Sequence, residues 1–173
     1  MVMSTTTLIP VDEYLRNSEK PNCEYRDGVL YPKSMPTLFH SLLEYMLVTM
    51  LRKLGLQAVS EVTVRLSPTK FLAPDVTAAP VLQGPYPTEP VLLCCEILSP
   101  EDRLGAMLAK CDEYHVWGVP YCWVIDPIKR TAWEYHSGEE PLRVTGTLRA
   151  GEHSIDLEEL FSALDTPPAR PDE

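Results

Sequence analysis

Residues 91–126 read VLLCCEILSPEDRLGAMLAKCDEYHVWGVPYCWVID, and they predict a strand, a helix and a second strand in succession. The segments VLLCCEILSP and PYCWVIDP are almost continuously apolar, which is typical of strands buried on both faces of a sheet. Between them, apolar residues recur at helical spacing: Leu104, Met107, Leu108, Cys111 and Tyr114. Gly118 then ends the helix. A helix that joins two strands in this way predicts a crossover and parallel pairing.

One residue contradicts the apolar character of the first strand. Residues 91–98 are all apolar except Glu96, and burying a carboxylate is costly unless it is paired, hydrogen-bonded or bound to a metal. Asp75 is a second carboxylate in a largely apolar segment, APDVTAA. If the two strands are neighbours, the carboxylates converge, and they repel unless a proton or a cation such as Mg²⁺ lies between them. The alternative is that each carboxylate caps or hydrates a loop at a strand end.

Three further polar residues are candidates for the same site. Lys110 lies at the border of the apolar face of its helix, so its ammonium group extends either toward Glu96 or into solvent. His40 lies in the first turn of a long predicted helix. Glu61 lies on the polar side of an alternating strand. An ordinary surface position is the alternative for all three.

The remaining elements predict a mixed central sheet flanked by helices, an α/β or α+β fold. Before the crossover we predict a short helix, a hairpin around Asp27-Gly28, a long helix and two strands, over residues 8–17, 23–32, 37–54, 58–66 and 71–80. In the first of those strands Val62, Val64 and Leu66 face one way. After the crossover we predict a hairpin partner, two edge strands and a short helix, over residues 130–136, 141–146, 152–156 and 157–164.

Length and composition indicate one intracellular domain. The 173 residues suit a single domain over residues 1–165, followed by a proline-rich, charged tail at 166–173 that we predict to be disordered. Apolar stretches are shorter than the roughly 20 residues of a membrane span, and no secretory signal is visible, so we expect a cytoplasmic protein without a membrane partner. The five cysteines form no CxxC pair, which favours reduced core residues.

The charge and the missing motifs exclude several function classes. The formal net charge of −10 argues against non-specific electrostatic binding to nucleic acid. The sequence contains no GxGxxG, GxxxxGK[ST], GxSxG or HExxH motif. The simplest dinucleotide-binding, NTPase, esterase and metalloprotease interpretations are therefore excluded.

The ordered set of motifs resembles the Uma-two family, a large bacterial family of restriction-endonuclease-like proteins in the PD-(D/E)XK nuclease superfamily. The motifs are CEYRDGVLY, a helix opening with FH, SEVTVRLSP, APDVTAA, VLLCCEILSP, a helix containing KCDEY, WGVPYCWVIDP and TAWEYH. The resemblance extends from about residue 8 to residue 163.

The resemblance implies a restriction-endonuclease-like core with its active site where the middle strands diverge. Asp75 matches the aspartate of the PD motif, and Glu96 matches the glutamate of the (D/E)XK motif. The superfamily's lysine would fall at Leu98, so the resemblance assigns that role to Lys110 on the following helix. His40 and Glu61 stand where similar proteins carry such residues, and they remain accessory candidates.

The implied function is a metal-dependent endonuclease that acts on DNA. Asp75, Glu96 and the backbone carbonyl of Ile97 would hold Mg²⁺ or Mn²⁺, and Lys110 would orient the attacking water or add positive charge beside the phosphate. Two alternatives remain open: an inactive nuclease-fold binding or interaction module, which the net charge of −10 favours, and a metal-dependent hydrolase of small phosphate esters. A homodimer is also expected, since nucleases that cut duplex DNA often need two sites.

Overall fold

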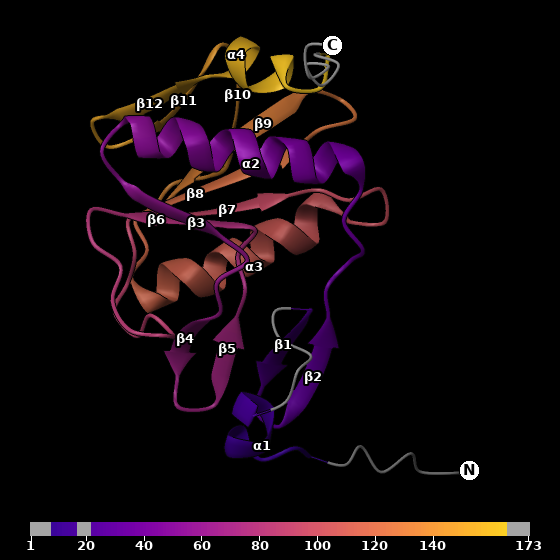
Figure 1. Ribbon diagram of the computed structural model, residues 1–173, viewed down its shortest axis with the longest axis vertical. Coiled ribbons are helices and arrows are strands. Elements are labelled where there is room, and N and C mark those ends of the chain that lie inside the picture. The colour runs from indigo at the N-terminus through magenta and orange to yellow at the C-terminus, as the bar shows by residue number, and fades with distance from the viewer. Residues whose placement is uncertain (1–7, 17–21, 166–173) are drawn as a thin grey trace, which may run out of the picture.

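A mixed six-stranded sheet forms the centre of the protein, as the computed structural model of residues 8–16 and 22–165 shows (Figure 1). Helix α2 (Leu38–Lys53) covers one face of this sheet, and helix α3 (Leu104–Trp117) covers the other. The strands run in the order β10 (Leu142–Val144), β9 (Thr131–His136), β8 (Tyr121–Asp126), β7 (Leu93–Ile97), β6 (Val76–Ala79) and β3 (Gln57–Ser60). The predicted fold class is therefore confirmed.

The strand–helix–strand crossover is confirmed in detail. Strands β7 and β8 pair in parallel from Leu93↔Tyr121 to Ile97↔Ile125, with α3 between them in the chain. All five residues of β7 are buried. Helix α3 ends at Gly118, whose φ of 117° is a conformation that residues with a side chain rarely adopt.

Each face of the central sheet has its own apolar core. The way in which β7 divides its side chains between the two cores shows the face on which Glu96 lies. One core contains Leu93, Cys95 and Ile97 of β7 together with α2, α4 (Leu157–Ser162), β11 (Thr147–Ala150) and β12 (His153–Asp156). The other contains Cys94 and Leu98 together with α3. Because successive residues of a strand point to opposite faces, Glu96 faces α3.

A second, antiparallel sheet lies beside α3, in the lower part of Figure 1. Its strands run in the order β2 (Val29–Pro32), β1 (Cys23–Arg26), β5 (Lys70–Leu72) and β4 (Val64–Ser67). The rings of Tyr14, Tyr25 and Phe71 pack between this sheet and helix α1 (Val11–Arg16). The predicted hairpin is confirmed, with positive φ at Asp27 and Gly28, as a tight hairpin turn requires.

Two predicted strands were wrong in extent, because the chain passes between the sheets within each of them. The segment 58–66 divides into β3 and β4, and Glu61 at φ 54° ends the pairing to the central sheet. The segment 71–80 divides into β5 and β6. The first segment alternates in sequence and the second is largely apolar, and both patterns are compatible with one continuous strand, so the sequence pattern does not reveal the breaks. Strand β11 was not predicted, and the tail predicted at 166–173 lies outside the described residues.

Two further observations concern the state of the cysteines and the length of the apolar helices. None of the five cysteines, all of which lie in the described residues, forms a disulfide; Cys94, Cys95, Cys111 and Cys122 are buried, and Cys23 is half-buried. Within residues 8–16 and 22–165, no helix combines the length and apolar character that crossing a bilayer requires.

Candidate active site

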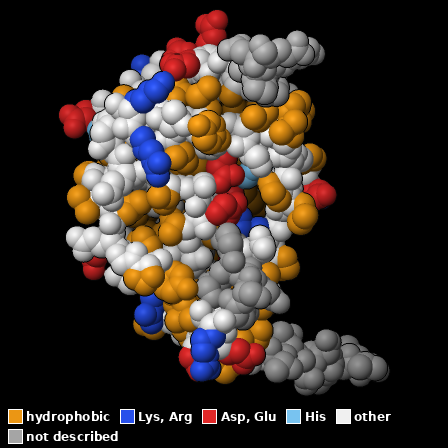
Figure 2. Space-filling model, in the orientation of Figure 1, with side chains coloured by type: hydrophobic (Ala, Val, Ile, Leu, Met, Phe, Trp, Pro, Cys, Tyr) orange, Lys and Arg blue, Asp and Glu red, His pale blue; other side chains and the backbone are white. Residues whose placement is uncertain are grey.

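The candidate site lies at the edge of the central sheet, where the chain crosses to the second sheet. Strands β6 and β7 pair antiparallel with Val76 opposite Cys95, so the next step of this register brings Asp75 opposite Glu96. A pocket of about 230 Å³ opens here, lined by Asp75, Glu96, Lys110, His40 and residues of the second sheet. Figure 2 shows acidic, basic and histidine side chains close together between the upper and lower parts of the molecule.

Asp75 is buried, and every one of its hydrogen bonds favours the carboxylate form. Its Oδ2 accepts the backbone N–H of Ile97 at 2.6 Å and lies 3.2 Å from His40 Nε2, while Oδ1 accepts from Lys33 Nζ at 2.9 Å. Burial opposes the charge, but the His40 hydrogen bond and the Lys33 ammonium outweigh it and hold the pKa of this carboxyl well below its usual range.

Glu96 is only 2% exposed, and two residues of α3 bind its carboxyl group. Lys110 Nζ lies 2.9 Å from Glu96 Oε2, and the Tyr114 hydroxyl donates to Oε1 at 2.7 Å. Lys110 and Tyr114 are one helical turn apart, so they reach the same group. Burial raises the pKa of Glu96 to about 7, since it outweighs the opposing charge of Lys110.

Lys110 is held between two glutamates, so its interpretation as a solvated surface lysine is wrong. Its side chain is 9% exposed, and Nζ lies 2.6 Å from Oε1 of Glu24 on β1 as well as close to Glu96. Burial opposes the positive charge, but the two glutamates outweigh it and raise the pKa of Lys110. Glu24 Oε1 also accepts the backbone N–H of Ala73 at 3.1 Å, which fixes the glutamate beside the crossing chain.

Lys33, which follows β2, contacts both Glu61 and Asp75 and so connects Glu61 with the site. Its Nζ donates to Glu61 Oε2 at 2.7 Å, to the Ala73 carbonyl at 2.9 Å and to Asp75. Glu61 also donates its backbone N–H to the carbonyl of Asp75 at 3.1 Å. Glu61 therefore contacts Asp75 through its own backbone and through the Lys33 ammonium, and its side chain is 31% exposed.

His40 lies at the amino end of α2, which Thr37 caps by accepting the His40 N–H. It continues the buried stripe of Leu43 and Leu47, so it projects over the end of the sheet and is 4% exposed. Its Nδ1 lies 3.7 Å from Glu44 Oε2. Burial lowers the pKa of His40, but the hydrogen bond to Asp75 outweighs it, and the net direction is upward.

Sequence reasoning missed Lys33, Glu24 and Tyr114. Lys33 lies in the loop segment YPKSMP, and nothing in its local pattern indicates that it pairs with Asp75, 42 residues away. Glu24 alternates with Cys23 and Tyr25 as any hairpin residue would, although the structure leaves it only 6% exposed. Tyr114 was assigned to the apolar face of α3, and its hydroxyl was overlooked.

The donor set fits a hard divalent cation in charge and type. Four carboxylates, those of Glu24, Glu61, Asp75 and Glu96, surround two ammonium groups, those of Lys33 and Lys110. Among the described residues, no group of three or more His, Cys, Asp or Glu side chains is arranged around one ion position. Mg²⁺ typically binds through one or two carboxylates and keeps several waters, so Asp75 and Glu96 suit it.

Comparison with known proteins identifies the family. A crystal structure titled "putative nuclease belonging to DUF820" from Anabaena variabilis ATCC 29413 has a TM-score of 0.77 and 21% sequence identity over 90% of this chain and 99% of that chain. At this identity the likeness concerns the fold. No curated protein matches the chain. The model of the Uma2 family, described as "Putative restriction endonuclease", matches residues 11–169, and the chain therefore belongs to the Uma2 family.

Proposed function

We propose that this protein is a metal-dependent endonuclease that hydrolyses phosphodiester bonds in DNA. One observation carries the proposal: Asp75 just before β6, Glu96 on β7 and Lys110 on α3 line one pocket at the edge of the central sheet. The family description and the nuclease-like fold support a nuclease. Buried carboxylates in a pocket, with pKa values moved in opposite directions, are typical of catalytic sites.

Asp75, Glu96 and the Ile97 carbonyl would hold Mg²⁺ or Mn²⁺. When bound, the metal would lower the pKa of a water molecule and stabilise the charge that develops on the phosphate. The protein's own groups pre-orient the two carboxylates. The Ile97 N–H and His40 hold Oδ2 of Asp75, while Lys110 and Tyr114 hold both oxygens of Glu96.

The two lysines have different roles in this proposal. Lys33 has the more exposed ammonium side chain, 14% against 9% for Lys110, and it contacts the one Asp75 oxygen that neither Ile97 nor His40 binds. We assign it to the phosphate, where a positive charge stabilises the transition state. Lys110 keeps Glu96 in place and supplies positive charge from behind it.

The proposal is tested by incubating plasmid DNA and single-stranded DNA with the protein and Mg²⁺ or Mn²⁺. We expect cleavage that EDTA abolishes, and a loss of roughly 100-fold or more in Asp75→Asn and Glu96→Gln. The exposed Glu101→Gln is the matched control and should cleave like the wild type. Cleavage that continues in EDTA, or in folded Asp75→Asn, would overturn the proposal.

A binding module with a nuclease fold is the second candidate. The net charge of −10 and the pairing of both lysines with carboxylates favour it, because they leave little positive charge for a phosphate. Calorimetry distinguishes the two functions. The enzyme should bind Mg²⁺ with an affinity that Asp75→Asn abolishes, whereas the binding module should take up no metal there. Nucleases that cut both strands of a duplex often need two sites, which a homodimer would provide, and sedimentation tests whether the protein dimerises.

A further inference from the structure

A second pocket, of about 560 Å³, adjoins the catalytic pocket. The two pockets share the lining residues Ser99 and Asp102, which follow β7, so they lie side by side. The volume lies within the range of ordinary ligand sites. We call this second pocket the flanking pocket. It lies between the start of α3 and the strands β9 and β10.

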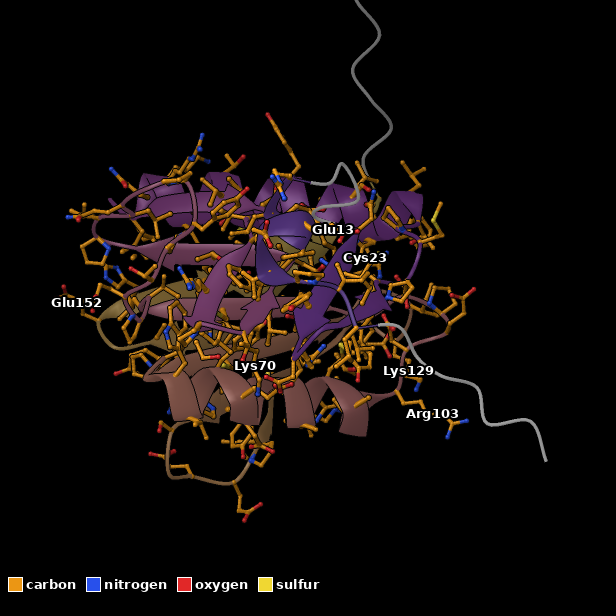
Figure 3. All side chains as sticks on the ribbon, turned by 90° about the horizontal axis from the view of Figure 1, so that it is seen from below. Glu13, Cys23, Lys70, Arg103, Lys129 and Glu152 are labelled. Atoms are coloured by element: carbon orange, nitrogen blue, oxygen red, sulfur yellow. The ribbon has the colours of Figure 1, made fainter. Side chains whose placement is uncertain are left out.

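An aromatic ring and two basic residues line the flanking pocket. Trp133 of β9 is half-buried, and Arg143 of β10 stands directly opposite it in the strand register. Residues directly opposite in an antiparallel pair lie on the same face of the sheet, so both side chains leave the sheet on the side of the flanking pocket. Lys129, 77% exposed, comes from the turn between β8 and β9. Figure 3 shows Lys129 and Arg103 at the same end of the molecule.

The two acidic residues of the flanking pocket are engaged in local turns. Asp102 accepts the Ser99 N–H at 2.8 Å and the Ser34 hydroxyl at 2.6 Å. Asp126 accepts the N–H groups of Ile128 and Lys129, at 3.0 and 2.9 Å. Their charges are therefore partly neutralised by backbone dipoles. The pocket is lined by two acidic and two basic side chains, and Lys129 Nζ lies 3.8 Å from Asp126 Oδ2. Within a chain of net charge −10, the exposed Lys129 and Arg143 are the groups of this pocket that an anion can contact.

We propose that the flanking pocket binds an unpaired nucleotide of the nucleic-acid strand, with its base on Trp133 and its phosphate on Arg143 and Lys129. The placement of this nucleotide next to the scissile phosphate rests on the proposed function. An aromatic platform beside basic groups is the usual arrangement for single strands, because any base presents a π face to it. In a paired, stacked duplex that face is covered, so single-stranded DNA is the preferred substrate.

Binding is tested by fluorescence anisotropy with a fluorescein-labelled single-stranded DNA oligonucleotide in EDTA, where the proposed enzyme does not cut. We expect Trp133→Leu to weaken binding roughly 5- to 150-fold, and Trp133→Phe to restore most of it. The double variant Lys129→Ala/Arg143→Ala should weaken binding and reduce the slope of log K against log salt by roughly 1.4. The double variant Lys53→Ala/Arg149→Ala changes the charge equally at exposed positions outside the pocket, and its loss of affinity should be much smaller.

Binding and cleavage are measured separately, so the flanking pocket and the proposed nuclease activity can fail independently. Oligonucleotide binding that requires Trp133, without any cleavage in Mg²⁺, supports the flanking pocket and contradicts the enzyme. Cleavage with unchanged binding in Trp133→Leu overturns the flanking pocket and leaves the enzyme intact. Absence of single-strand binding, or duplex binding of equal strength, overturns the inference. If Trp133→Leu fails to fold by circular dichroism, the exposed double variant Lys129→Ala/Arg143→Ala decides instead, and an unchanged affinity and salt slope in it would overturn the inference.

Discussion

Glu96 is the residue that most directly links the site to stability. Its pKa is raised to about 7 by burial, from 4.5 in an exposed carboxyl. Between these two values the folded protein therefore binds a proton that the unfolded chain releases. Because stability falls with rising pH wherever the folded state binds more protons, Glu96 lowers the stability progressively from about pH 4.5 to above pH 7.

This pH dependence gives the first prediction. In EDTA, Glu96→Gln should gain stability relative to the wild type as the pH rises from 5 to 8, by on the order of 3 kcal/mol at most. Urea unfolding at both pH values measures the difference in the free energy of unfolding. Glu101→Gln, which changes an exposed glutamate, should follow the wild type at both. A stability difference between Glu96→Gln and wild type that does not vary with pH would contradict the titration.

Lys110 gives the second prediction, because it is the counter-charge for two buried glutamates. Lys110→Met should lower the free energy of unfolding by about 3–5 kcal/mol, since it leaves Glu24 and Glu96 without their shared cation. Adding Glu24→Gln should restore part of that loss. Lys53→Met, at an exposed position of α2, should change stability by less than about 0.5 kcal/mol. A small effect of Lys110→Met in urea unfolding would show that the cluster carries no net stabilisation.

The residues of the candidate site differ in how far the sequence predicts that they belong to it. Asp75 and Glu96 stand out because each is a carboxylate in a largely apolar segment. Burying such a charge is costly unless it has a partner, so a site is expected there. Lys110 required the family resemblance, since a lysine on a helix border is ordinarily solvated. Lys33 and Glu24 carry no local signal. They reach the site only because the hairpin of the second sheet folds against α3, and that is a long-range contact.

At the scale of elements, the two strands whose extent was predicted wrongly both break at the site itself. The strands predicted over 58–66 and 71–80 both break where the chain changes sheets, next to Glu61 and Asp75. Periodicity describes which face a side chain takes, but not which sheet the strand joins. The crossover was predictable because the pattern of the two strands and of the helix between them is consistent, with Glu96 as the exception. Irregular backbone at a candidate site is where local rules are expected to fail.

The end of α3 gives the third prediction, because its position sets where Lys110 lies. Gly118 has φ 117°, and an added Cβ would lie 2.9 Å from Cγ of Pro90. Gly118→Ala should therefore destabilise the protein by more than about 1 kcal/mol. Gly105, on the same helix, has no heavy atom within 4 Å of the corresponding position, so Gly105→Ala should stabilise by about 0.5–1 kcal/mol. Thermal unfolding compares the two, and equal effects would contradict the strain at Gly118.

At the scale of the whole molecule, the site is shared between the two sheets. The central sheet supplies Asp75 and Glu96, and the second sheet with its connecting loop supplies Glu24 and Lys33. Polar contacts hold the second sheet against α3. Arg26 and Lys70 both pair with Glu113 on α3, at 2.9 and 3.0 Å. Glu113 thus lies at the junction of the two halves without touching either of the proposed metal-binding carboxylates.

Removing that junction should loosen the site without unfolding the central sheet, which is the fourth prediction. In Glu113→Ala, the paired amides of β1 and β2 should exchange with deuterium roughly two- to tenfold faster, because Arg26 and Lys70 lose their common partner. The amides of β7 and β8 should keep wild-type rates, since their ladder is buried between α2 and α3. Glu158→Ala, an exposed change on α4, is the matched control and should alter neither set. Equal acceleration in both sheets would mean that they open together, and unchanged rates in β1 would mean that apolar packing alone docks the second sheet.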